Sequence, residues 1–366
     1  MVEQAPKTNL LGIGRSGLED FFAAMGEKPF RARQLLQWIY QRGVTDFDAM
    51  TDLSRPLRER LATSATIEPP GVMREQRSAD GTIKWLMTLP GVHAVETVFI
   101  PEPDRATLCI SSQVGCMLNC TFCSTATQGF SRNLSAGEII GQVWLAAQRA
   151  DRRITNVVLM GMGEPLLNLD QVRPALELLR DDLAYGLAAR RVTVSTAGVV
   201  PGIDALRNAP PIALAVSLHA PNDELRSRLV PLNRKYPIDE LMAACKRYLG
   251  GYASGKQSIT WEYTMIDGVN DSPALARDLR RLLSHIPSKV NLIPFNPFPG
   301  TPFRCSPAER MQRFQQELRA GGLIATVRRT RGDDIDAACG QLVGKVLSAG
   351  QRRALIQQQL ARQALA

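Results

Sequence analysis

The stretch GCMLNCTFCSTATQGFSRN at residues 115–133 places three of the seven cysteines of this 366-residue chain within eight positions. They are Cys116, Cys120 and Cys123, and their spacing is C-x3-C-x2-C. Three thiolates suit an iron–sulfur cluster that keeps one iron free of a protein ligand. A structural zinc ion normally takes four ligands, and no fourth Cys or His lies nearby. A redox pair of Cys120 and Cys123 leaves Cys116 without a role. We favour the cluster, with zinc and the redox pair as open alternatives.

On both sides of this stretch, short apolar or β-branched runs alternate with helical segments. Such alternation is typical of βαβ units and of a parallel sheet covered on both faces. About six strand–helix units are visible, fewer than the eight of a closed barrel, so we expect an α/β fold built as a partial, TIM-like (β/α)6 barrel. TLCIS at 107–111 is the first expected strand; the others lie at 154–160, 191–195, 212–219, 258–266 and 289–295, with helices at 135–150, 168–180, 222–230, 237–249 and 272–285.

The first 70 residues are predicted to form a small helical accessory domain. A capping box from Ser16 to Glu19 opens one helix, and a second is expected from Pro29 to Gly43. The segment GIGRSG at 12–17 matches a dinucleotide-binding pattern, but no strand precedes it, so we interpret it as a flexible lead-in.

The remaining chain divides into three predicted parts. Residues 71–105 are expected to form a β-hairpin extension that turns at Asp80–Gly81. Residues 106–325 form the barrel, and residues 326–366 form a C-terminal segment that ends in a basic helix.

The charge of the chain suits a polyanionic partner. Lys and Arg outnumber Asp and Glu by nine, and residues 1–90 are nearly neutral, so the excess lies in the rest of the chain. A basic surface of this kind fits RNA or DNA. A solubilising surface explains the charge equally well.

The cellular compartment follows from what the sequence does not contain. No run approaches the ~18 apolar residues of a membrane span, and the N-terminus carries no signal pattern. We therefore expect a cytoplasmic protein without a membrane partner. In that reducing compartment, seven cysteines do not indicate a disulfide framework.

Longer motifs resemble those of the RlmN/Cfr family of radical S-adenosylmethionine (SAM) RNA methyltransferases. The aromatic Phe122 before the third cysteine belongs to the radical SAM signature that the triplet resembles. The family motifs are CISSQVGCMLNCTFCSTATQGFSRNLSAGEI, NVVLMGMGEPLLN, VTVSTAGVVP, ALAVSLHAPND, NLIPFNPFPG and RGDDIDAACGQL. The resemblance extends from near residue 70 to near residue 345.

This resemblance implies a cofactor set and the residues that hold it. Cys116, Cys120 and Cys123 are expected to hold one [4Fe–4S] cluster, and SAM, two molecules per turnover, is expected to bind the fourth iron. SAM contacts are expected at Gly163, Glu164, Ser195, Ser217, Leu218, His219 and Asn296. Taken alone, His219 would be read as a core histidine, and GMGEP as a strand-to-helix turn.

The same resemblance implies roles for two further cysteines. Adenine C2 is electron-poor, so a methyl group is better loaded onto a protein thiolate first and then activated as a radical. Cys339 is expected to carry that methyl, Cys109 to release the product by forming a Cys109–Cys339 disulfide, and Glu96 to accept a proton. Cys339 is expected to approach Cys109 on a mobile loop. Cys245 and Cys305 are expected to be packing residues.

The implied reaction is methylation at C2 of adenosine 2503 in 23S rRNA and of adenosine 37 in tRNAs. The expected partners are these RNAs, bound across the barrel mouth with the target base extruded, and an electron donor such as a flavodoxin system. We expect a monomer. A C8-directed rRNA methyltransferase of the Cfr type stays open, as does a non-enzymatic RNA-binding protein with a structural metal.

Overall fold

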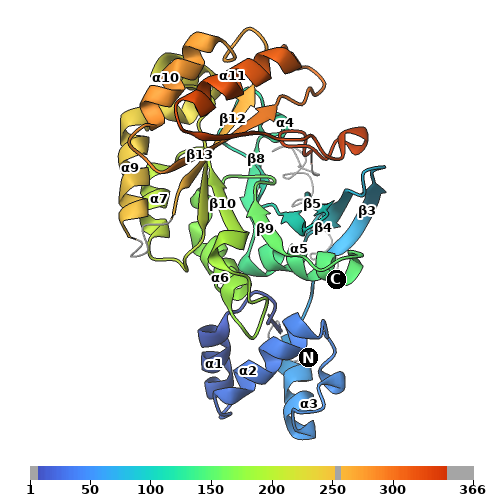
Figure 1. The fold of residues 1–366 in the computed structure, drawn as a ribbon. Helices are drawn as coiled ribbons and strands as arrows, with labels where there is room; N and C mark the ends of the chain where they lie inside the picture. The colour runs from blue at the N-terminus through green and yellow to red at the C-terminus, as the bar shows by residue number, and fades with distance from the viewer. Residues whose placement is uncertain (1–6, 252–256, 344–366) are drawn as a thin grey trace, which may run out of the picture.

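The computed structural model describes residues 7–251 and 257–343, and it places a helical unit beneath a larger α/β body (Figure 1). The basic helix expected at the C-terminus lies outside the described residues. Within the described residues, no helix is long and apolar enough to cross a membrane.

The larger body is organised around a ten-stranded sheet of order β14-β13-β12-β11-β10-β9-β6-β5-β4-β3. Neighbouring strands from β6 to β14 pair in parallel, and those from β3 to β6 pair antiparallel. The strands are β3 (Gly71–Arg77), β4 (Ile83–Thr88), β5 (Ala94–Glu102), β6 (Arg105–Cys109), β9 (Asn156–Leu159), β10 (Val192–Thr196), β11 (Ala213–Ser217), β12 (Ile259–Met265), β13 (Ser288–Pro294) and β14 (Ile324–Val327).

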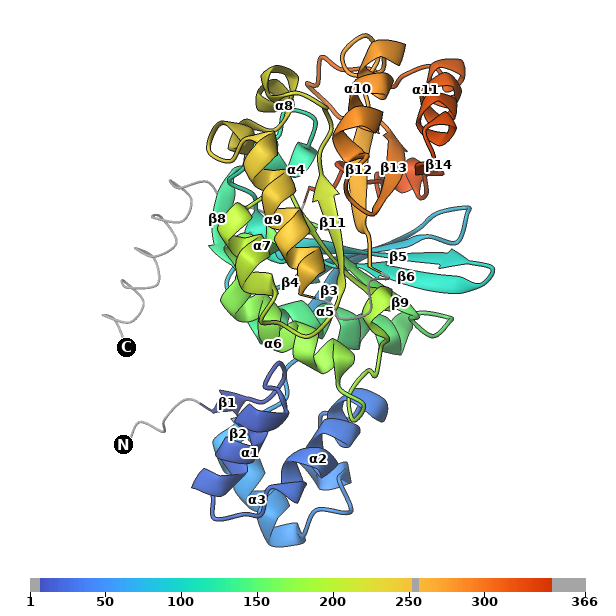
Figure 2. The same cartoon turned by 60° about the vertical axis from the view of Figure 1, so that its left-hand side comes forward.

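A helix follows each of the six parallel strands from β6 to β13, which confirms the partial (β/α)6 barrel. These crossover helices are α5 (Ala136–Arg149), α6 (Leu169–Arg180), α7 (Val200–Leu206), α8 (Asp223–Leu229) with α9 (Ile238–Gly250), α10 (Pro273–Leu283) and α11 (Ala308–Ala320). Helices α6, α7 and α9 lie on the outer face of the sheet (Figure 2).

Three elements of the barrel escaped the sequence prediction. Helix α7 spans only two turns. Helix α11 buries just Phe314 and Leu318, too few apolar residues for a clear helical period. Strand β14 is short and mostly exposed, because it forms the edge of the sheet.

The expectation that both faces of the parallel sheet are covered is wrong. Alternate residues of β9 and β10 are only half-buried, and the inner face of the sheet lines a cavity of about 830 Å³. Successive side chains of a strand point to opposite faces, so one face packs on the helices and the other stays open.

The hairpin extension forms where it was predicted. Strands β3 and β4 pair antiparallel, and the amide of Ser78 donates to the Thr82 carbonyl at 2.8 Å. Gly81 adopts a φ of +84° in this turn, which favours glycine.

The N-terminal unit is helical, as expected, but its first helix begins differently. Its elements are β1 (Thr8–Asn9), α1 (Arg15–Ala24), α2 (Phe30–Leu36), a π-helical continuation (Gln37–Gln41), α3 (Arg55–Ser64) and β2 (Ala65–Thr66). The predicted capping box at Ser16 is wrong, because α1 already begins at Arg15 with Gly14 as its N-cap and no side-chain cap. The helix therefore begins one residue before Ser16, without a capping side chain.

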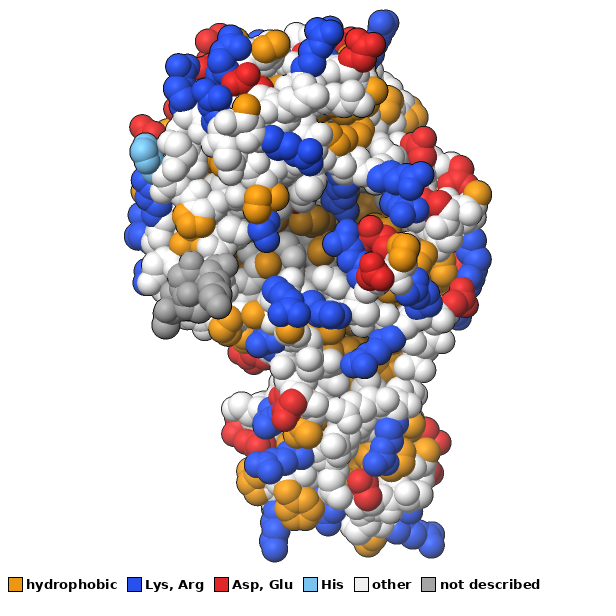
Figure 3. Space-filling view, in the orientation of Figure 1, with side chains coloured by type: hydrophobic (Ala, Val, Ile, Leu, Met, Phe, Trp, Pro, Cys, Tyr) orange, Lys and Arg blue, Asp and Glu red, His pale blue; other side chains and the backbone are white. Residues whose placement is uncertain are grey.

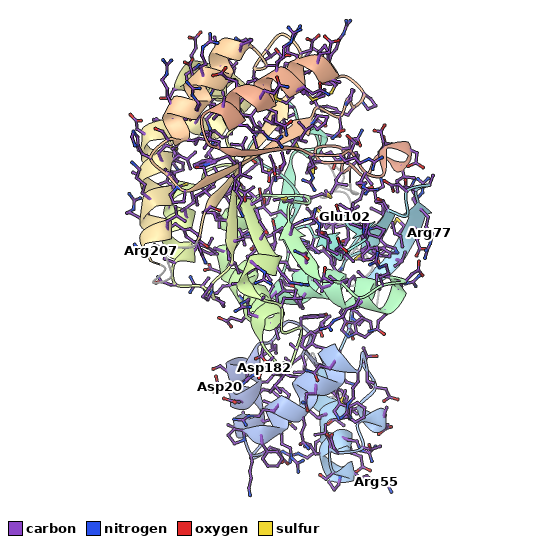
Figure 4. The ribbon with its side chains drawn as sticks, in the orientation of Figure 1. Asp20, Arg55, Arg77, Glu102, Asp182 and Arg207 are labelled. Carbon is purple, nitrogen blue, oxygen red and sulfur yellow. The ribbon has the colours of Figure 1, made fainter. Side chains whose placement is uncertain are left out.

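The GIGRSG segment also proves to be a packing contact and not a flexible lead-in. A Cβ placed on Gly12 would lie 2.2 Å from the backbone nitrogen of Gly137 in α5. The Arg15 guanidinium pairs with Asp181 and Asp182, each at 2.6 Å. Asp182 lies at the junction of the helical unit and the larger body (Figure 4). These contacts hold the helical unit against the barrel.

Candidate active site

The three cysteines of the triplet lie on one loop at the carboxyl end of the barrel. This loop joins β7 (Gln113–Gly115) to the short helix α4 (Ser124–Thr127), and β8 (Phe130–Asn133) returns beside β7. Gly115 has a φ of +76°, and a Cβ there would lie 1.9 Å from the Gly129 carbonyl oxygen. The amide of Thr121 donates to the Leu229 carbonyl at 3.0 Å, which ties the loop to α8.

The three thiols of this loop are desolvated, and their charges influence one another's pKa values. Burial raises the pKa of Cys116 to about 12, and it also raises those of Cys120 and Cys123. The charge of Cys123 raises the pKa values of both other thiols further. Three such groups become stable thiolates together only when a positively charged group binds them.

An iron–sulfur cluster fits this donor set. The thiolates of a cluster bind separate iron atoms and need not converge on one point. The triplet is therefore suited to a cluster with an open iron.

The GMGEP segment at residues 161–165 follows β9, and its Glu164 is hydrogen-bonded to the residue after β10. Gly163 has a φ of +97°, and a Cβ there would lie 2.5 Å from the Gln113 Cβ. The Glu164 carboxylate accepts one hydrogen bond from the Leu166 amide at 3.0 Å and one from the Ala197 amide at 2.8 Å. Burial raises the pKa of Glu164 to about 7. This carboxylate has no cationic partner among these contacts, so it can receive one from a ligand.

His219 packs directly against the cluster loop. Its ring centroid lies 4.4 Å from that of Phe122, and its backbone has a φ of +59°. The Thr264 amide donates to its Nδ1 at 2.9 Å, so the ring proton of the neutral form lies on Nε2. Burial lowers the pKa of His219 to about 3. The ring therefore stays neutral and presents Nε2–H as a donor.

The other expected SAM contacts are distributed between two places. Ser195 lies on β10 and Ser217 ends β11, both half-buried, and the Leu218 amide donates to the Glu262 carbonyl at 3.0 Å. Asn296 follows β13 and instead donates from Nδ2 to the Cys339 carbonyl at 3.0 Å. Asn296 thus links the expected SAM region to the loop of Cys339.

The cavity on the inner face of the sheet brings Cys109 and Cys339 together. Both cysteines line it, although 229 intervening residues separate them in the chain. Figure 3 shows the hollow near the centre of the larger body, with Lys and Arg side chains around it. Burial raises the pKa of the Cys109 thiol to about 12, and the Cys339 charge raises it further.

The loop that carries Cys339 is hydrogen-bonded to the helix that follows the triplet. The Ser124 amide donates to the Gly340 carbonyl at 2.7 Å, and the Thr125 hydroxyl donates to the Leu342 carbonyl at 2.7 Å. The cysteine cavity and the cluster loop are therefore parts of one site.

Glu96 faces this loop as one half of a buried ion pair. Its Oε1 lies 3.1 Å from Lys84 Nζ, and its Oε2 accepts from the Val343 amide at 2.8 Å. Lys84 also donates to the Asp336 carbonyl at 3.1 Å. The pair therefore contacts both ends of the Cys339 loop, a role that sequence reasoning did not assign to either residue.

Sequence reasoning also missed two arginines of the site. Arg226 is fully buried and donates to the Ala197, Ser217 and Leu218 carbonyls at 2.7, 3.1 and 3.2 Å. Arg328 donates from Nη1 to the sulfur of Cys339 at 3.2 Å. Arg328 stands directly after β14 in the basic run VRRTR, and that run was the available signal.

The two remaining cysteines lie on α9 and in the loop between β13 and α11. Cys245 is completely buried on α9, as expected of a packing residue. Cys305 is half-buried and forms an isolated β-bridge with Ile266.

A partial (β/α)6 barrel with a three-thiol loop at the carboxyl ends of its strands defines a radical SAM enzyme. The radical SAM superfamily model matches residues 110–279, and the model of the ribosomal RNA large subunit methyltransferase N-terminal domain matches residues 8–67. A radical SAM methyltransferase from Sphaerobacter thermophilus shares the fold at a TM-score of 0.85 and 49% identity, over 92% of this chain and 99% of that one.

Two relatives narrow the class from radical SAM enzymes to RNA methyltransferases. The dual-specificity RNA methyltransferase RlmN of Marinobacter nauticus is 56% identical over 352 residues, which cover 94% of this chain and 95% of that protein. RlmN of Alkalilimnicola ehrlichii is 56% identical over 359 residues, which cover 97% of this chain and 99% of that protein. The chain belongs to the RlmN family of radical SAM methyltransferases. The alternative of a non-enzymatic protein with a structural metal is therefore wrong.

Proposed function

We propose that this chain methylates C2 of adenosine 2503 in 23S rRNA and C2 of adenosine 37 in tRNAs, through a methyl group carried on Cys339. The observation that carries the proposal is the shared cavity of Cys109 and Cys339 together with the hydrogen bonds that tie the Cys339 loop to the cluster helix α4. The names of the relatives support RNA as the substrate class.

Each group of residues has its own task in this proposal. Cys116, Cys120 and Cys123 hold a [4Fe–4S] cluster. The cluster, when bound, reductively cleaves SAM and so supplies the radical that activates the methyl group. Gly163 and Glu164 bind the methionine end of SAM. The Glu164 carboxylate is buried and accepts hydrogen bonds from the Leu166 and Ala197 amides, and an amino group of SAM can donate to it as well.

His219, Asn296 and the serines of β10 and β11 complete the SAM site. His219 donates from Nε2, since its Nδ1 is already occupied by a backbone amide. Ser195, Ser217 and the backbone of Leu218 lie at neighbouring strand ends. Asn296 joins this site to the Cys339 loop.

Cys339 accepts the methyl group as a thiolate, and Cys109 later resolves the adduct. The Cys109 thiolate attacks the sulfur of Cys339, which frees the methylated base and leaves a Cys109–Cys339 disulfide for a cellular dithiol to reduce. Glu96 accepts the proton that leaves the base. The buried Lys84 Nζ lies 3.1 Å from its Oε1 and holds the carboxylate in place.

RNA is expected to enter through the opening of the cavity. Exposed basic residues line it, namely Arg105, Arg190 and Lys289, and they are placed to bind phosphates. A volume of about 830 Å³ accommodates one extruded adenosine beside the SAM site. The protein is proposed to act in the cytoplasm, where both RNAs and the electron donor are found.

Anaerobic turnover with 23S rRNA and with tRNA, followed by nucleoside analysis, tests the proposal. We expect 2-methyladenosine from both RNAs, and none from a Cys339→Ala variant that keeps its iron. Formation of 8-methyladenosine would assign the C8 reaction instead. Absence of methyl on the Cys339 peptide under every turnover condition would refute the methylcysteine route.

A further inference from the structure

Arg328 contacts one of the two sulfurs that the proposed function uses and shares the cavity with the other. Its Nη1 lies 3.2 Å from the sulfur of Cys339, and both Arg328 and Cys109 line the cavity. The charge of Cys339 raises the pKa of Arg328 most, and Glu262, Cys109 and Glu102 raise it further. Glu102, at the end of β5, lies beside the same cavity (Figure 4).

The sheet holds this arginine in position, whereas a loop holds its sulfur partner. The Arg328 amide donates to the Leu292 carbonyl at 2.8 Å, which continues the pairing of β13 with β14. On the neighbouring strand β12, Glu262 is buried, and its Oε1 accepts a hydrogen bond from Asn291 Nδ2 at 3.0 Å. The guanidinium therefore has a buried carboxyl neighbour on the sheet and a thiol neighbour on the loop.

We propose that Arg328 is a catalytic residue that stabilises the thiolate of Cys339 for methyl acceptance and then the thiolate of Cys109 for product release. The inference rests on the proposed function. A guanidinium is always charged, and a cation beside a thiol favours its thiolate form.

The electron count explains why one arginine serves both sulfurs in turn. The Cys339 thiolate uses its lone pair to form a bond to the methyl carbon, and the bond between that carbon and the sulfonium breaks. The product on Cys339 is a neutral thioether, so the negative charge of Cys339 no longer acts on Arg328. Cys109 is then the remaining thiol near the cation.

Cys109 needs such help because it is buried in apolar surroundings. Burial raises its pKa to about 12, and Arg328 is the group that lowers it by charge. In the release step the Cys109 thiolate forms the S–S bond, and the carbon–sulfur bond of Cys339 breaks with its electron pair going to the carbon. That carbon then takes up a proton from water and becomes the methyl group of the product. A dithiol reductant restores both thiols.

The thiols and charges near the two sulfurs come from several elements. Cys109 ends β6, Cys123 precedes α4 and its pKa is raised by the charge of Cys339, and Arg328 follows β14. Glu262 lies on β12 and acts on Arg328. Arg328 is the cation in this set, so its removal tests the idea directly.

Site-resolved alkylation of the cluster-loaded enzyme, reduced and without SAM, provides the measurement. Iodoacetamide reacts with the thiolate, so its rate at the Cys339 peptide, followed by mass spectrometry from pH 6 to 10, reports ionisation. In Arg328→Met we expect the midpoint to rise by about one pH unit or more, with about tenfold slower alkylation below it. Arg328→Lys should lie between, and Arg329→Met, which removes the exposed neighbouring arginine, should match the parent.

A second experiment tests whether Arg328 also stabilises the thiolate of Cys109. In a Cys339→Ala background, adding Arg328→Met should slow the alkylation of Cys109 about tenfold at pH 9, because a smaller fraction of this thiol is ionised. The completely buried Cys245 serves as an internal control, because it reacts rapidly only if a variant unfolds.

The two possible failures give different results. An unchanged Cys339 midpoint in a folded Arg328→Met protein would overturn the role of Arg328. Since alkylation needs no methyl transfer, failure of the proposed function would appear instead as absent methylcysteine during turnover, with the alkylation shift intact.

Discussion

Replacing Lys84 with methionine is expected to release the loop that carries Cys339. Lys84 Nζ lies 3.1 Å from Glu96 Oε1 and 3.1 Å from the Asp336 carbonyl. Glu96 Oε2 holds the Val343 amide at 2.8 Å. The two ends of the 336–343 loop are therefore bound to a single ion pair, and Lys84→Met removes its charge while keeping most of its apolar stem.

The magnitude follows from the burial of the pair. The side chains of Lys84 and Glu96 are 7% and 10% exposed, so the substitution leaves a carboxylate buried without its cation. Breaking such a pair costs about 3–5 kcal/mol, and the lost hydrogen bond to Asp336 adds about 1 kcal/mol. We expect the free energy of unfolding to fall by about 4 kcal/mol. The double variant Lys84→Met/Glu96→Gln should be more stable than Lys84→Met, because no unpaired charge remains.

Urea unfolding and amide hydrogen exchange measure the two consequences. Amides of residues 337–343 should lose protection in Lys84→Met, whereas those of α9 should not. Lys246→Met, at an exposed lysine of α9, is the matched control and should change stability by less than about 0.5 kcal/mol. Unchanged protection of the loop, together with a stability loss below about 1 kcal/mol, would show that the Lys84–Glu96 pair does not hold the loop.

Three further variants test other contacts of the site. Gly163→Ala should lose about 2 kcal/mol or more of stability and bind SAM more weakly, because its Cβ would meet Gln113 at a φ of +97°; equilibrium binding and thermal unfolding measure both. His219→Asn should remove an acid sensitivity. The pKa of His219 is lowered from 6.5 to about 3 on folding, so the unfolded chain binds the proton first, and the parent should lose about 2 kcal/mol between pH 7 and pH 5 that the variant keeps. Parallel pH profiles of urea unfolding for the two proteins would contradict this. Arg226→Met should cost about 4 kcal/mol, because three buried carbonyls lose a charged donor. It should also lower the iron bound per chain, since Arg226 acts by charge on Cys120; an unchanged iron content would show that this charge is dispensable.

Most of the barrel could be predicted from local patterns. The expected strands and helices from residue 135 to residue 295 agree closely with β9–β13 and with α5, α6 and α8–α10, because each carries the apolar period of its type. The start of α1 could not be predicted in this way. Gly12, two residues before its N-cap, packs closely on Gly137 of α5, and a contact between remote parts of the chain is not visible in a local pattern.

The sequence by itself determined the ligand loop, because three thiols within eight positions need no distant partner to form a set. The family motifs likewise led to the proposal that Cys109, Cys339 and Glu96 act in one reaction. Only the tertiary structure decided what surrounds them. Arg328 reaches Cys339 because β14 pairs with β13, and Lys84 reaches the loop because β4 lies beside β5. Such contacts join residues from remote parts of the chain, and their distances depend on how the sheet twists and packs, which no local pattern encodes.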